Sequence, residues 1–528
     1  MNFIFSMKQT IVARLRGLPI LAGLTLLAAS VDVSPALAQK SKDTLRLAFA
    51  DPIGTILIYE DQKPEGGLVA PAVFDSLLCF NARKGTVEPL LATTWKWIDE
   101  RTLEMTLRQD VKFHDGSDFS GEDVVHTLNW LVDPNSKLRF TENFSWIDHA
   151  ELIDRFTLRI HANTTFAPAL VRLATGSMPM LPKSVHGDPA KRAEFGIKTP
   201  IGTGPYRAEY VDSNKGIMLV KNDRYPQAND CKPAPTIGRI QILPIPDLQT
   251  QIAQLTVGNL DYLKIAEKDQ SDMLGADPRL AVTALQGLTY NYMAIDASGR
   301  SGNAPLQDIR VRRALMQSID RSLITRSVVA GGDQAIVKDE LCFSHQLGCG
   351  FSAKPPPFDR SAAKALLTEA GYPDGFDVEL LATPSVFGLA EALAGEMRKI
   401  GVRAKVDRST FVAYRDKQRL GKQQILINEW SSGGLPDASS TADYYFADGP
   451  RDYWRDKEIQ ELSRKGISTL DDAKRREIYK RIFDKSTEQS YVLPISTKPA
   501  VFVHTKELEI APGSISVYGA ELYQMKWK

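Results

Sequence analysis

The stretch that decides the fold runs from residue 73 to residue 128 and reads VFDSLLCFNARKGTVEPLLATTWKWIDERTLEMTLRQDVKFHDGSDFSGEDVVHTL. Within it, residues 102–108 alternate apolar and polar side chains, which is the pattern of a half-buried β-strand. The Asp-Gly pair at 115–116 predicts a turn. Ser120 followed by Asp123 predicts the start of a helix, because the two residues can cap each other's backbone N–H groups. The stretch therefore predicts a strand, a turn and a helix in close succession.

Outside this stretch, the same reasoning predicts further elements. Residues 44–49 alternate as a strand does. In the carboxyl-terminal half, apolar residues at four-residue steps predict one helix over 311–323. Two more helices are predicted over 359–371 and 389–400, each stopped by glycine, and an alternating strand follows the second at 402–406. Helices that alternate with strands indicate an α/β lobe.

The first forty residues have the order of an export signal. Three basic residues within the first 16 positions precede an apolar run at 18–29, and small residues follow at 36–38. The run is too short to span a membrane, so we expect cleavage after Ala38 and a soluble, periplasmic mature chain. Gln39, not a cysteine, would begin that chain, which argues against a lipid anchor.

The length of the chain indicates how many domains it forms, and its charge indicates which partners it can bind. Without the signal, 490 of the 528 residues remain, enough for two or three domains. The chain has 65 basic and 64 acidic residues and a net charge of +1, with no basic block of the kind that binds phosphates. We therefore expect no nucleic-acid partner.

The four cysteines allow three pairings in an oxidising compartment. Cys342 and Cys349 flank a short loop, and we predict a disulfide between them. They also flank His345, so a zinc site is an alternative, although no fourth ligand is nearby. The sequence does not determine the state of Cys79 and Cys231.

Several ordered motifs resemble the family 5 extracellular solute-binding proteins, the peptide and nickel group. The motifs are Pro89–Ala92, Trp95, Asp99–Thr102, Val111–Gly116, GTGPYR at 202–207, DIRVRRALMQSIDR at 308–321 and AKALLTEAGYPDGFD at 363–377. The resemblance implies an α/β, two-lobed periplasmic binding protein (class II, Venus-flytrap type) with an additional domain inserted in the first lobe. Its implied divisions are a signal peptide at 1–38, the first lobe at 39–78, 179–290 and 493–528, the inserted domain at 79–178 and the second lobe at 291–492.

The resemblance also implies a function. A protein of this family captures a small, peptide-like or otherwise polar solute by hinge closure and delivers it to the permease and ATPase of an ABC importer in the inner membrane. We expect a monomer that is not an enzyme and needs no cofactor or metal. One alternative is an exported hydrolase, which would use the adjacent His114 and Asp115 as an acid–base pair. The other is a periplasmic carrier or chaperone that is not coupled to import.

The segment 427–446 is the predicted ligand-binding region, because it combines loop-forming glycine, serine and proline with aromatic and acidic side chains. Trp430 is predicted to stack on the ligand, and Asp437 to bind a cationic or hydroxyl group. The other candidate contacts are Ser431, Ser432, Tyr290 and Asn291.

One position departs from the pattern of the peptide-binding members. Their corresponding segment reads Gly-Trp-x-x-Asp, and its aspartate pairs with the amino group of the ligand. Trp430 matches that tryptophan, but Gly433 stands at the aspartate position. A buried ammonium group without its carboxylate loses a charge-assisted hydrogen bond. The departure therefore predicts weak binding of unmodified dipeptides.

Overall fold

The computed structural model describes residues 43–60, 64–138, 141, 143–198, 200–265, 267–331, 334–510 and 520–528. The predicted signal peptide and its cleavage site at Ala38 lie outside the described residues. Within the described part of the chain, no helix has the length and apolar character needed to cross a membrane.

The first lobe is built on a seven-stranded sheet. Across the sheet, the strands are β12 (Leu280–Leu285), β18 (Ala500–Thr505), β11 (Tyr262–Ile265), β1 (Thr44–Phe49), β10 (Arg239–Pro244), β9 (Gly216–Lys221) and β8 (Tyr206–Asp212). The predicted strand at 44–49 is confirmed as β1, which is parallel to both of its neighbours. Its alternating Leu45 and Leu47 pack with α1 (Pro64–Val73) on one face. Helices α6 (Leu248–Thr256) and α7 (Lys268–Gly275) cover the other face.

A separate four-stranded antiparallel sheet lies between β1 and β8 in the sequence. Its order is β4 (Ala92–Trp97), β5 (Thr102–Leu107), β7 (Thr157–Ala162) and β6 (Ile147–Asp154), and α2 (Gly121–Val132) packs with it. The predicted capping box is confirmed, since the Asp123 carboxylate accepts the backbone N–H of Ser120 at 2.9 Å. The shorter elements are β2 (Leu78–Asn81), β3 (Thr86–Pro89), η1 (Pro134–Ser136), α3 (Ala169–Leu173), α4 (Lys183–His186), α5 (Pro189–Arg192), β19 (Leu508–Glu509), η6 (Leu522–Gln524) and β20 (Lys526–Trp527).

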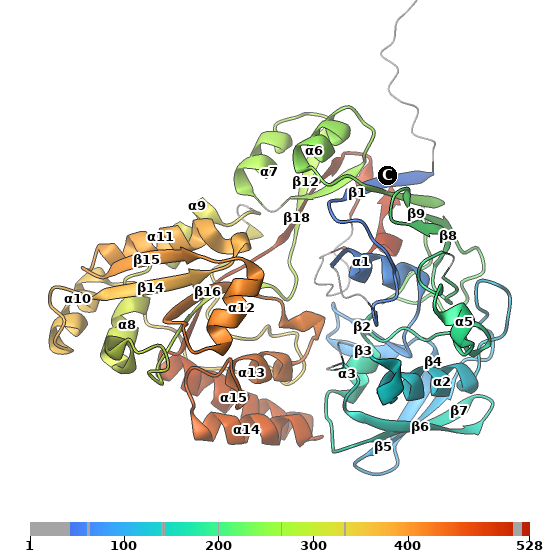
Figure 1. Ribbon diagram of the computed structural model, residues 1–528, viewed down its shortest axis with the longest axis horizontal. Coiled ribbons are helices and arrows are strands. Elements are labelled where there is room, and N and C mark those ends of the chain that lie inside the picture. The colour runs from blue at the N-terminus through green and yellow to red at the C-terminus, as the bar shows by residue number, and fades with distance from the viewer. Residues whose placement is uncertain are drawn as a thin grey trace, which may run out of the picture. The chain divides into compact units, whose positions relative to one another are not determined.

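The second lobe is a sheet with helices on both faces (Figure 1). Its strands, in order, are β15 (Arg403–Arg408), β14 (Asp377–Ala382), β16 (Ile425–Trp430), β13 (Tyr290–Ile295) and β17 (Val492–Thr497). Alternate residues of each strand face opposite sides, so Met293 and Tyr292 lie in different core clusters. One side packs against α8 (Ile309–Gln317), α9 (Arg321–Val328), α10 (Arg360–Glu369) and α11 (Phe387–Arg398), and the other against α12 (Phe411–Arg419), α13 (Ala438–Phe446), α14 (Lys457–Ser468) and α15 (Asp472–Glu488). The 3₁₀ turns η2 (Ala304–Gln307) and η4 (Pro384–Val386) precede α8 and α11.

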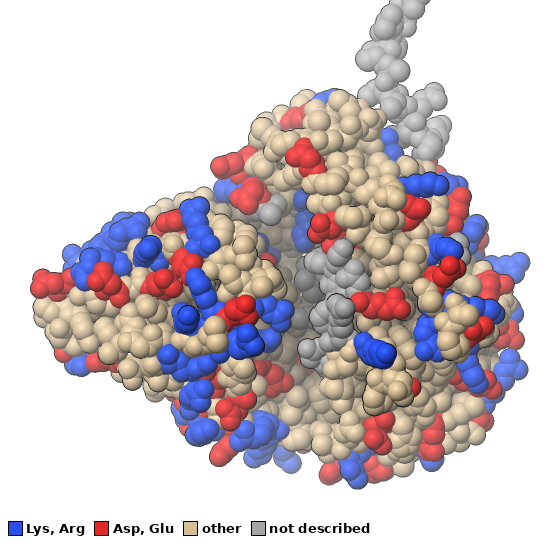
Figure 2. Space-filling model, viewed as in Figure 1, with Lys and Arg blue, Asp and Glu red and all other residues tan. Residues whose placement is uncertain are grey.

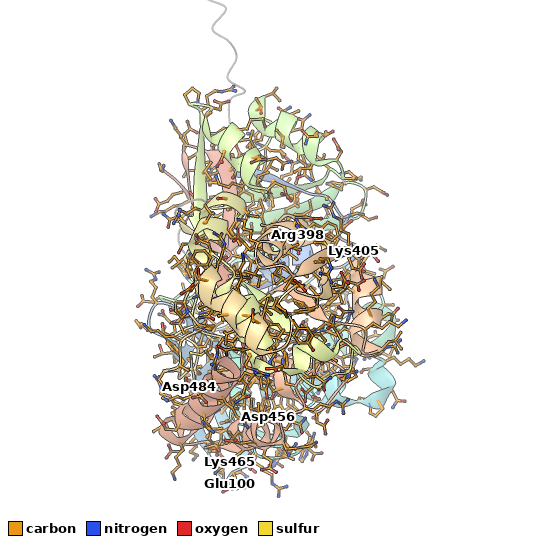
Figure 3. All side chains as sticks on the ribbon, turned by 90° about the vertical axis from the view of Figure 1, so that its left-hand side faces the viewer. Glu100, Arg398, Lys405, Asp456, Lys465 and Asp484 are labelled. Carbon is orange, nitrogen blue, oxygen red and sulfur yellow. A yellow bond between two sulfur atoms is a disulfide. The ribbon has the colours of Figure 1, made fainter. Side chains whose placement is uncertain are left out.

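Figure 3 looks onto this lobe, with Arg398 of α11 and Lys405 of β15 above Asp456 and Asp484, which belong to the α14 and α15 layer.

The prediction of one helix over 311–323 is wrong. The chain forms two helices there, and α8 ends at Gln317 before Asp320 caps α9 by accepting the backbone N–H of Leu323 at 2.9 Å. The four-residue steps continued across the break by coincidence, and Leu323 is 44% exposed. The other two helices are confirmed as α10 and α11, and the strand at 402–406 as β15.

The chain passes between the two large sheets twice, at 286–289 and at 498–499. The sequence division placed the second passage after residue 492. In the structure, β17 instead pairs with β13 and belongs to the sheet of the second lobe. The difference arises because a crossing strand is identified by its hydrogen-bonded neighbour, which the sequence does not show.

Candidate functional site

The predicted ligand region begins where parallel strands of the second lobe end. β14 is parallel to both β15 and β16, so their carboxyl ends lie at the same edge of the sheet. In α/β sheets, that edge is where ligands bind. Thr383, Ser409 and Trp430 stand at the ends of these three strands. The candidate site is built on this edge.

Trp430 is part of an aromatic stack. Its ring lies on that of Tyr444 with centroids 3.8 Å apart and an angle of 18° between the planes. The indole N–H donates to Thr441 Oγ1 at 3.2 Å, and the Arg451 guanidinium lies 5.1 Å from the Tyr444 centroid. Trp430 and Tyr444 are both half-buried. The stack therefore holds a rigid aromatic surface that is still open to a ligand.

A hydrogen-bonded row of side chains lies next to the stack. Tyr414 is hydrogen-bonded to Tyr444 through their hydroxyl oxygens at 3.2 Å, and the Asn428 amide donates to Tyr414 at 3.2 Å. The Thr383 hydroxyl donates to Asn428 at 3.0 Å. These side chains come from the residue that follows β14 and from α12, β16 and α13, so the row ties separate parts of the lobe to the site. Sequence reasoning missed this row, since no local pattern marks it.

Most of the predicted loop at 427–446 is regular structure. After a 3₁₀ turn, η5 (Ser432–Gly434), the chain enters α13, whose N-cap is Asp437. The Asp437 carboxylate accepts the backbone N–H of Ser439 at 2.8 Å, as an N-cap does. An aspartate before a run with Ala438, Ala442 and Tyr445 at helical spacing was the signal for this helix.

Asp437 does not face a ligand. Its side chain is fully buried, and its two oxygens accept Arg475 guanidinium hydrogens at 2.7 and 2.6 Å. A carboxylate that already has a buried, bidentate arginine has no remaining charge to offer a ligand ammonium. These contacts give Asp437 a structural role in place of the predicted anchoring one.

The remaining predicted contacts are divided between the surface and the core. Ser431 is partly exposed beside Trp430. Ser432 is fully buried, and Tyr290 lies in the aromatic core beneath the site. Asn291 is 3% exposed and donates to Ser496 Oγ at 3.1 Å. Of these four side chains, only Ser431 is more than marginally exposed to solvent.

Charged residues of both lobes meet near the passage between the sheets. Lys498 forms an ion pair with Glu429 of β16, and Lys264 of β11 lies within the electrostatic field of both and of Glu65 of α1. The Lys264 side chain keeps contact with solvent, yet the surrounding protein lowers its pKa by desolvation. This combination is typical of a group that lines a cleft. Figure 2 shows a recess between the lobes and charges of both signs around it.

Both pairs of cysteines form disulfides. Cys342 and Cys349, the pair predicted from the short loop, have Cα atoms 5.9 Å apart. Cys79 and Cys231, which the sequence left undetermined, join β2 to a loop after β9 with Cα atoms 6.3 Å apart. Among the described residues, the one group of metal-ligand type is Cys79, Glu88 and Cys231. Its two sulfur atoms are bonded to each other, so it offers no thiolate to a metal.

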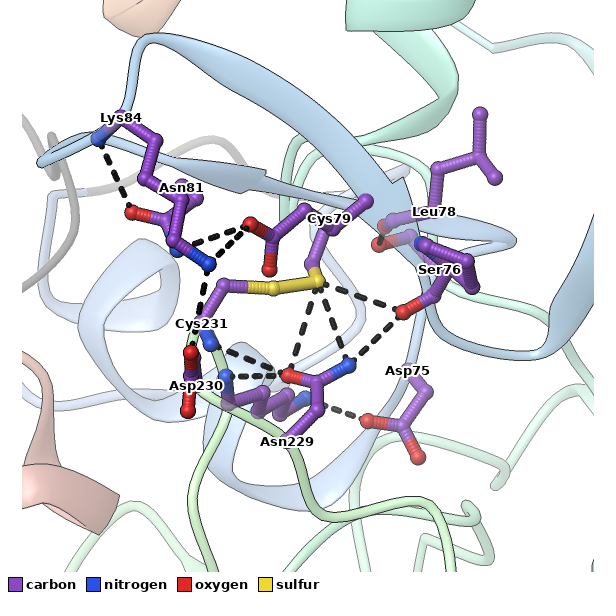
Figure 4. Close-up of a disulfide and its surroundings, with 12 residues drawn as sticks. Asp75, Ser76, Leu78, Cys79, Asn81, Lys84, Asn229, Asp230 and Cys231 are labelled. Atoms are coloured by element: carbon purple, nitrogen blue, oxygen red, sulfur yellow. Dashed lines mark hydrogen bonds and ion pairs between the residues drawn. A yellow bond between two sulfur atoms is a disulfide. The ribbon is translucent and has the colours of Figure 1, made fainter.

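A buried aspartate lies beside the Cys79–Cys231 disulfide (Figure 4). Asp75 is fully buried and its carboxylate contacts the Lys232 ammonium at 2.5 Å. Three neutral side chains also donate to it: Thr203 at 2.9 Å, Tyr225 at 2.9 Å and Gln227 at 2.7 Å. This network connects the end of α1 with the GTGPY turn and the loop at 225–232.

The His114–Asp115 pair does not have the geometry of an acid–base couple. His114 Nδ1 accepts the Gly202 N–H at 3.2 Å, and its Nε2 is hydrogen-bonded to the Gly204 carbonyl at 3.0 Å. Burial lowers the pKa of His114. Asp115 caps its own turn by accepting Ser117 N–H and O–H groups. Both imidazole nitrogens are therefore occupied by backbone, and the hydrolase alternative has lost its catalytic pair.

Residues 86–452 match the family model described as "Bacterial extracellular solute-binding proteins, family 5 Middle". The chain belongs to this family. The glutathione-binding protein GsiB of Salmonella typhimurium is 24% identical over 500 residues, which cover 91% of this chain and 94% of GsiB. Heme-binding protein A of Haemophilus influenzae is 25% identical over 409 residues, 69% of this chain and 70% of that protein. The solved structure of HbpA2 from Haemophilus parasuis has a TM-score of 0.78 at 22% identity and covers 92% of this chain and 100% of that one.

Family membership fixes the general role. Family 5 proteins are periplasmic, two-lobed substrate-binding proteins that bind small, peptide-like ligands and work with the permease and ATPase of ABC importers. They are binding proteins and not enzymes. This family 5 protein is therefore the substrate-binding component of an ABC importer.

Proposed function

We propose that this family 5 protein captures a small polar solute between its lobes, on the Trp430–Tyr444 surface, and presents it to the importer. The aromatic stack at the carboxyl edge of the second sheet carries this proposal, because Trp430 follows Glu429, whose charge acts on Lys264 of the first lobe. A solute that contacts both lobes favours the closed state by its differential binding energy. The closed protein is then the form that the permease recognises.

The proposed lobes follow the two passages of the chain. The first lobe comprises 43–285 and 500–528, with the sheet of β4 to β7 as its inserted domain, and the second comprises 290–497. We also propose that residues 1–38 are a signal peptide, from the order of their basic, apolar and small residues. Amino-terminal sequencing of the periplasmic protein should begin at Gln39, and a retained leader in the membrane fraction would refute the cleavage.

The chemistry of the loop supports a solute that needs no carboxylate for an ammonium group. Gly433 stands where peptide-binding members carry an aspartate, and Asp437 is neutralised by Arg475. Glu429, another carboxylate near this edge, is paired with Lys498. Unmodified dipeptides should therefore bind weakly, and a polar solute with a planar or apolar part should bind better.

Two experiments identify the solute. Gentle denaturation of the purified protein releases any bound solute for mass spectrometry. Calorimetry on the ligand-stripped protein then compares the released solute with reduced glutathione, hemin and a panel of dipeptides. Small-angle scattering with each saturating ligand should show a smaller radius of gyration if the lobes close.

Three variants test where the solute binds. Trp430→Ala and Tyr444→Ala remove the aromatic surface, and we expect each to weaken binding by about 30-fold, or about 2 kcal/mol. Trp97→Ala, a half-buried tryptophan of the inserted sheet, is the matched control and should leave affinity unchanged. Tight binding of ordinary dipeptides, with no loss in the Trp430 variant, would overturn both the solute class and the site.

A further inference from the structure

The loop closed by Cys342 and Cys349 lies directly against the ligand loop, residues 431–437. The Leu347 N–H donates to the Pro436 carbonyl at 3.0 Å, and the Ala438 N–H donates to the Leu347 carbonyl at 2.9 Å. Leu347 and Asp437 thereby form an isolated parallel β-bridge. Backbone hydrogen bonds thus join two loops that are far apart in the sequence.

One buried amide side chain connects the same two loops. Gln346 is 1% exposed, and its Oε1 accepts the Phe343 N–H of the disulfide loop at 2.7 Å. Its Nε2 donates to Ser432 Oγ at 3.1 Å and lies 3.4 Å from the carbonyl oxygens of Leu435 and Asp437. Every polar atom of this side chain is used, and its donor group reaches three acceptors of the ligand loop.

The ligand loop needs such support because its backbone is strained. Ser432 has a φ of 53°, in the left-handed region that costs a residue with a side chain about 1–2 kcal/mol. It is nevertheless fully buried and starts the η5 turn. A strained residue keeps its conformation only where its surroundings determine it, and Gln346 is the side chain that contacts the Ser432 hydroxyl.

The disulfide loop is itself firmly attached to the second lobe. The Lys338 ammonium donates to the Cys342 carbonyl at 2.7 Å and lies 4.0 Å from the centroid of Phe343. Val337 pairs with Ser496 of β17. The loop is therefore a fixed support, against which the ligand loop is placed.

We propose that Gln346 is the positioning residue of the ligand loop, and that the Cys342–Cys349 disulfide holds Gln346 in place. The loop then has its binding conformation before any solute arrives, which lowers the ordering cost of binding. This inference rests on the proposed function in one respect, namely that residues 431–437 border the solute.

Hydrogen–deuterium exchange of the ligand-free full chain tests the proposal without a solute. The readout is the exchange rate of amides in peptides that span 431–438. Gln346→Met removes the amide at nearly constant volume, and we expect these amides to exchange at least about 10-fold faster. Cys342→Ser/Cys349→Ser should have the same effect. Cys79→Ser/Cys231→Ser removes the disulfide of the other lobe and, under conditions in which this variant stays folded, should leave the 431–438 peptides unchanged.

A rescue variant separates positioning from simple packing. Glycine adopts a left-handed φ without strain. Gln346→Met/Ser432→Gly should therefore recover at least half of the lost protection on a logarithmic scale. If Gln346→Met does not fold, Gln346→Glu, which keeps the shape and the acceptor but loses the donor, replaces it in the comparison. Exchange in Gln346→Met within about 2-fold of the natural protein, or no recovery with Ser432→Gly, would overturn the proposal.

The exchange experiment tests the role of Gln346, and the affinity of Trp430→Ala tests the proposed binding site, so the two can fail separately. Faster exchange together with an unchanged solute affinity in Trp430→Ala would keep Gln346 as the positioning residue of the loop and move the solute elsewhere. Unchanged exchange together with a large loss in Trp430→Ala would do the reverse.

Discussion

Each lobe buries an aspartate near a disulfide, but the two carboxylates are neutralised differently. Asp75 of the first lobe shares its charge among Lys232 and three neutral donors. Asp437 of the second lobe depends on Arg475 and on one backbone N–H. The first network distributes the charge over several loops, whereas the second concentrates it on one side chain.

The comparison shows why the residue type and its setting in the sequence are not enough to identify a ligand anchor. Asp437 lies in a segment rich in serine and glycine beside Trp430, and its setting favoured a role in binding. Asp75 lies in an apolar run and attracted no such prediction. Both are fully buried and paired. Only the location of Arg475 and Lys232, far away in sequence, shows that neither carboxylate is free for a ligand.

The largest expected effect is the loss of stability when a disulfide is removed, and this loss should differ between the two disulfides. The Cys79–Cys231 bond closes a loop of 152 residues and the Cys342–Cys349 bond one of 7. In the chain-entropy description, losing the first costs about 5 kcal/mol and losing the second about 2.4 kcal/mol. Urea unfolding of Cys79→Ser/Cys231→Ser and Cys342→Ser/Cys349→Ser measures both. Equal losses would show that native contacts, and not loop length, decide the stability that each bond provides.

Removal of Arg475 tests the concentrated network. Arg475→Met leaves a buried carboxylate with only its N-cap hydrogen bond, and we expect a loss of about 3–5 kcal/mol in the free energy of unfolding. Asp437→Asn/Arg475→Met, in which the charge is also absent, should recover much of that loss. If the single and double variants are equally unstable, the cost lies in the packing of Arg475 and not in the unpaired charge.

Removal of Lys232 tests the distributed network. Lys232→Met leaves Asp75 with three neutral donors, so the expected loss is smaller, about 2–3 kcal/mol. Thr203→Val is the control within the network and should cost about 1 kcal/mol, as the loss of one hydrogen bond does. A Lys232 variant as unstable as Arg475→Met in the same urea titration would remove the distinction between the two networks.

Acid should act in opposite directions through one buried group of each lobe, His186 and Asp443, with the smallest of these effects. Burial lowers the pKa of His186, in the first lobe, to about 3, while its unfolded value is about 6.5. The unfolded state therefore binds the proton first, and stability falls as the pH drops below about 6.5. Between pH 7 and pH 5, this histidine should cost the first lobe about 2 kcal/mol. His186→Phe should flatten that dependence.

Asp443 of α13 should change the stability in the opposite direction when the pH falls. Burial raises its pKa to about 6, although the Ser463 hydroxyl donates to it and Arg172 and Arg475 are nearby. The folded state binds the proton first as the pH falls through 6, so this residue adds stability to the second lobe on acidification. Exchange rates of core amides at pH 7 and pH 5, corrected for the intrinsic rate, are compared in the natural protein and in Asp443→Asn. The same pH dependence of the second lobe in both proteins would contradict the prediction.

Local patterns predicted the helices and strands that are determined by residues close together in the sequence. β1, β5, the capped start of α2, and helices α10 and α11 follow from periodicity and caps. The break between α8 and α9 was missed because Asp320 caps a helix within an uninterrupted apolar pattern. At the site, Trp430 could be found from its motif. The hydrogen-bonded row of Thr383, Asn428 and Tyr414 could not, since its members come from separate elements.

The sequence by itself determined the family, the two-lobed α/β class and the short disulfide loop, and it pointed to Trp430 as a candidate ligand contact, because these depend on residue type and spacing along the chain. Only the tertiary structure decided which polar groups are already satisfied. Burial and pairing are properties of neighbours in space, so Asp437 became a structural residue once Arg475 was placed against it. For the same reason, Gln346 is inconspicuous in the sequence and central in the fold, where it contacts a loop that begins 85 residues later.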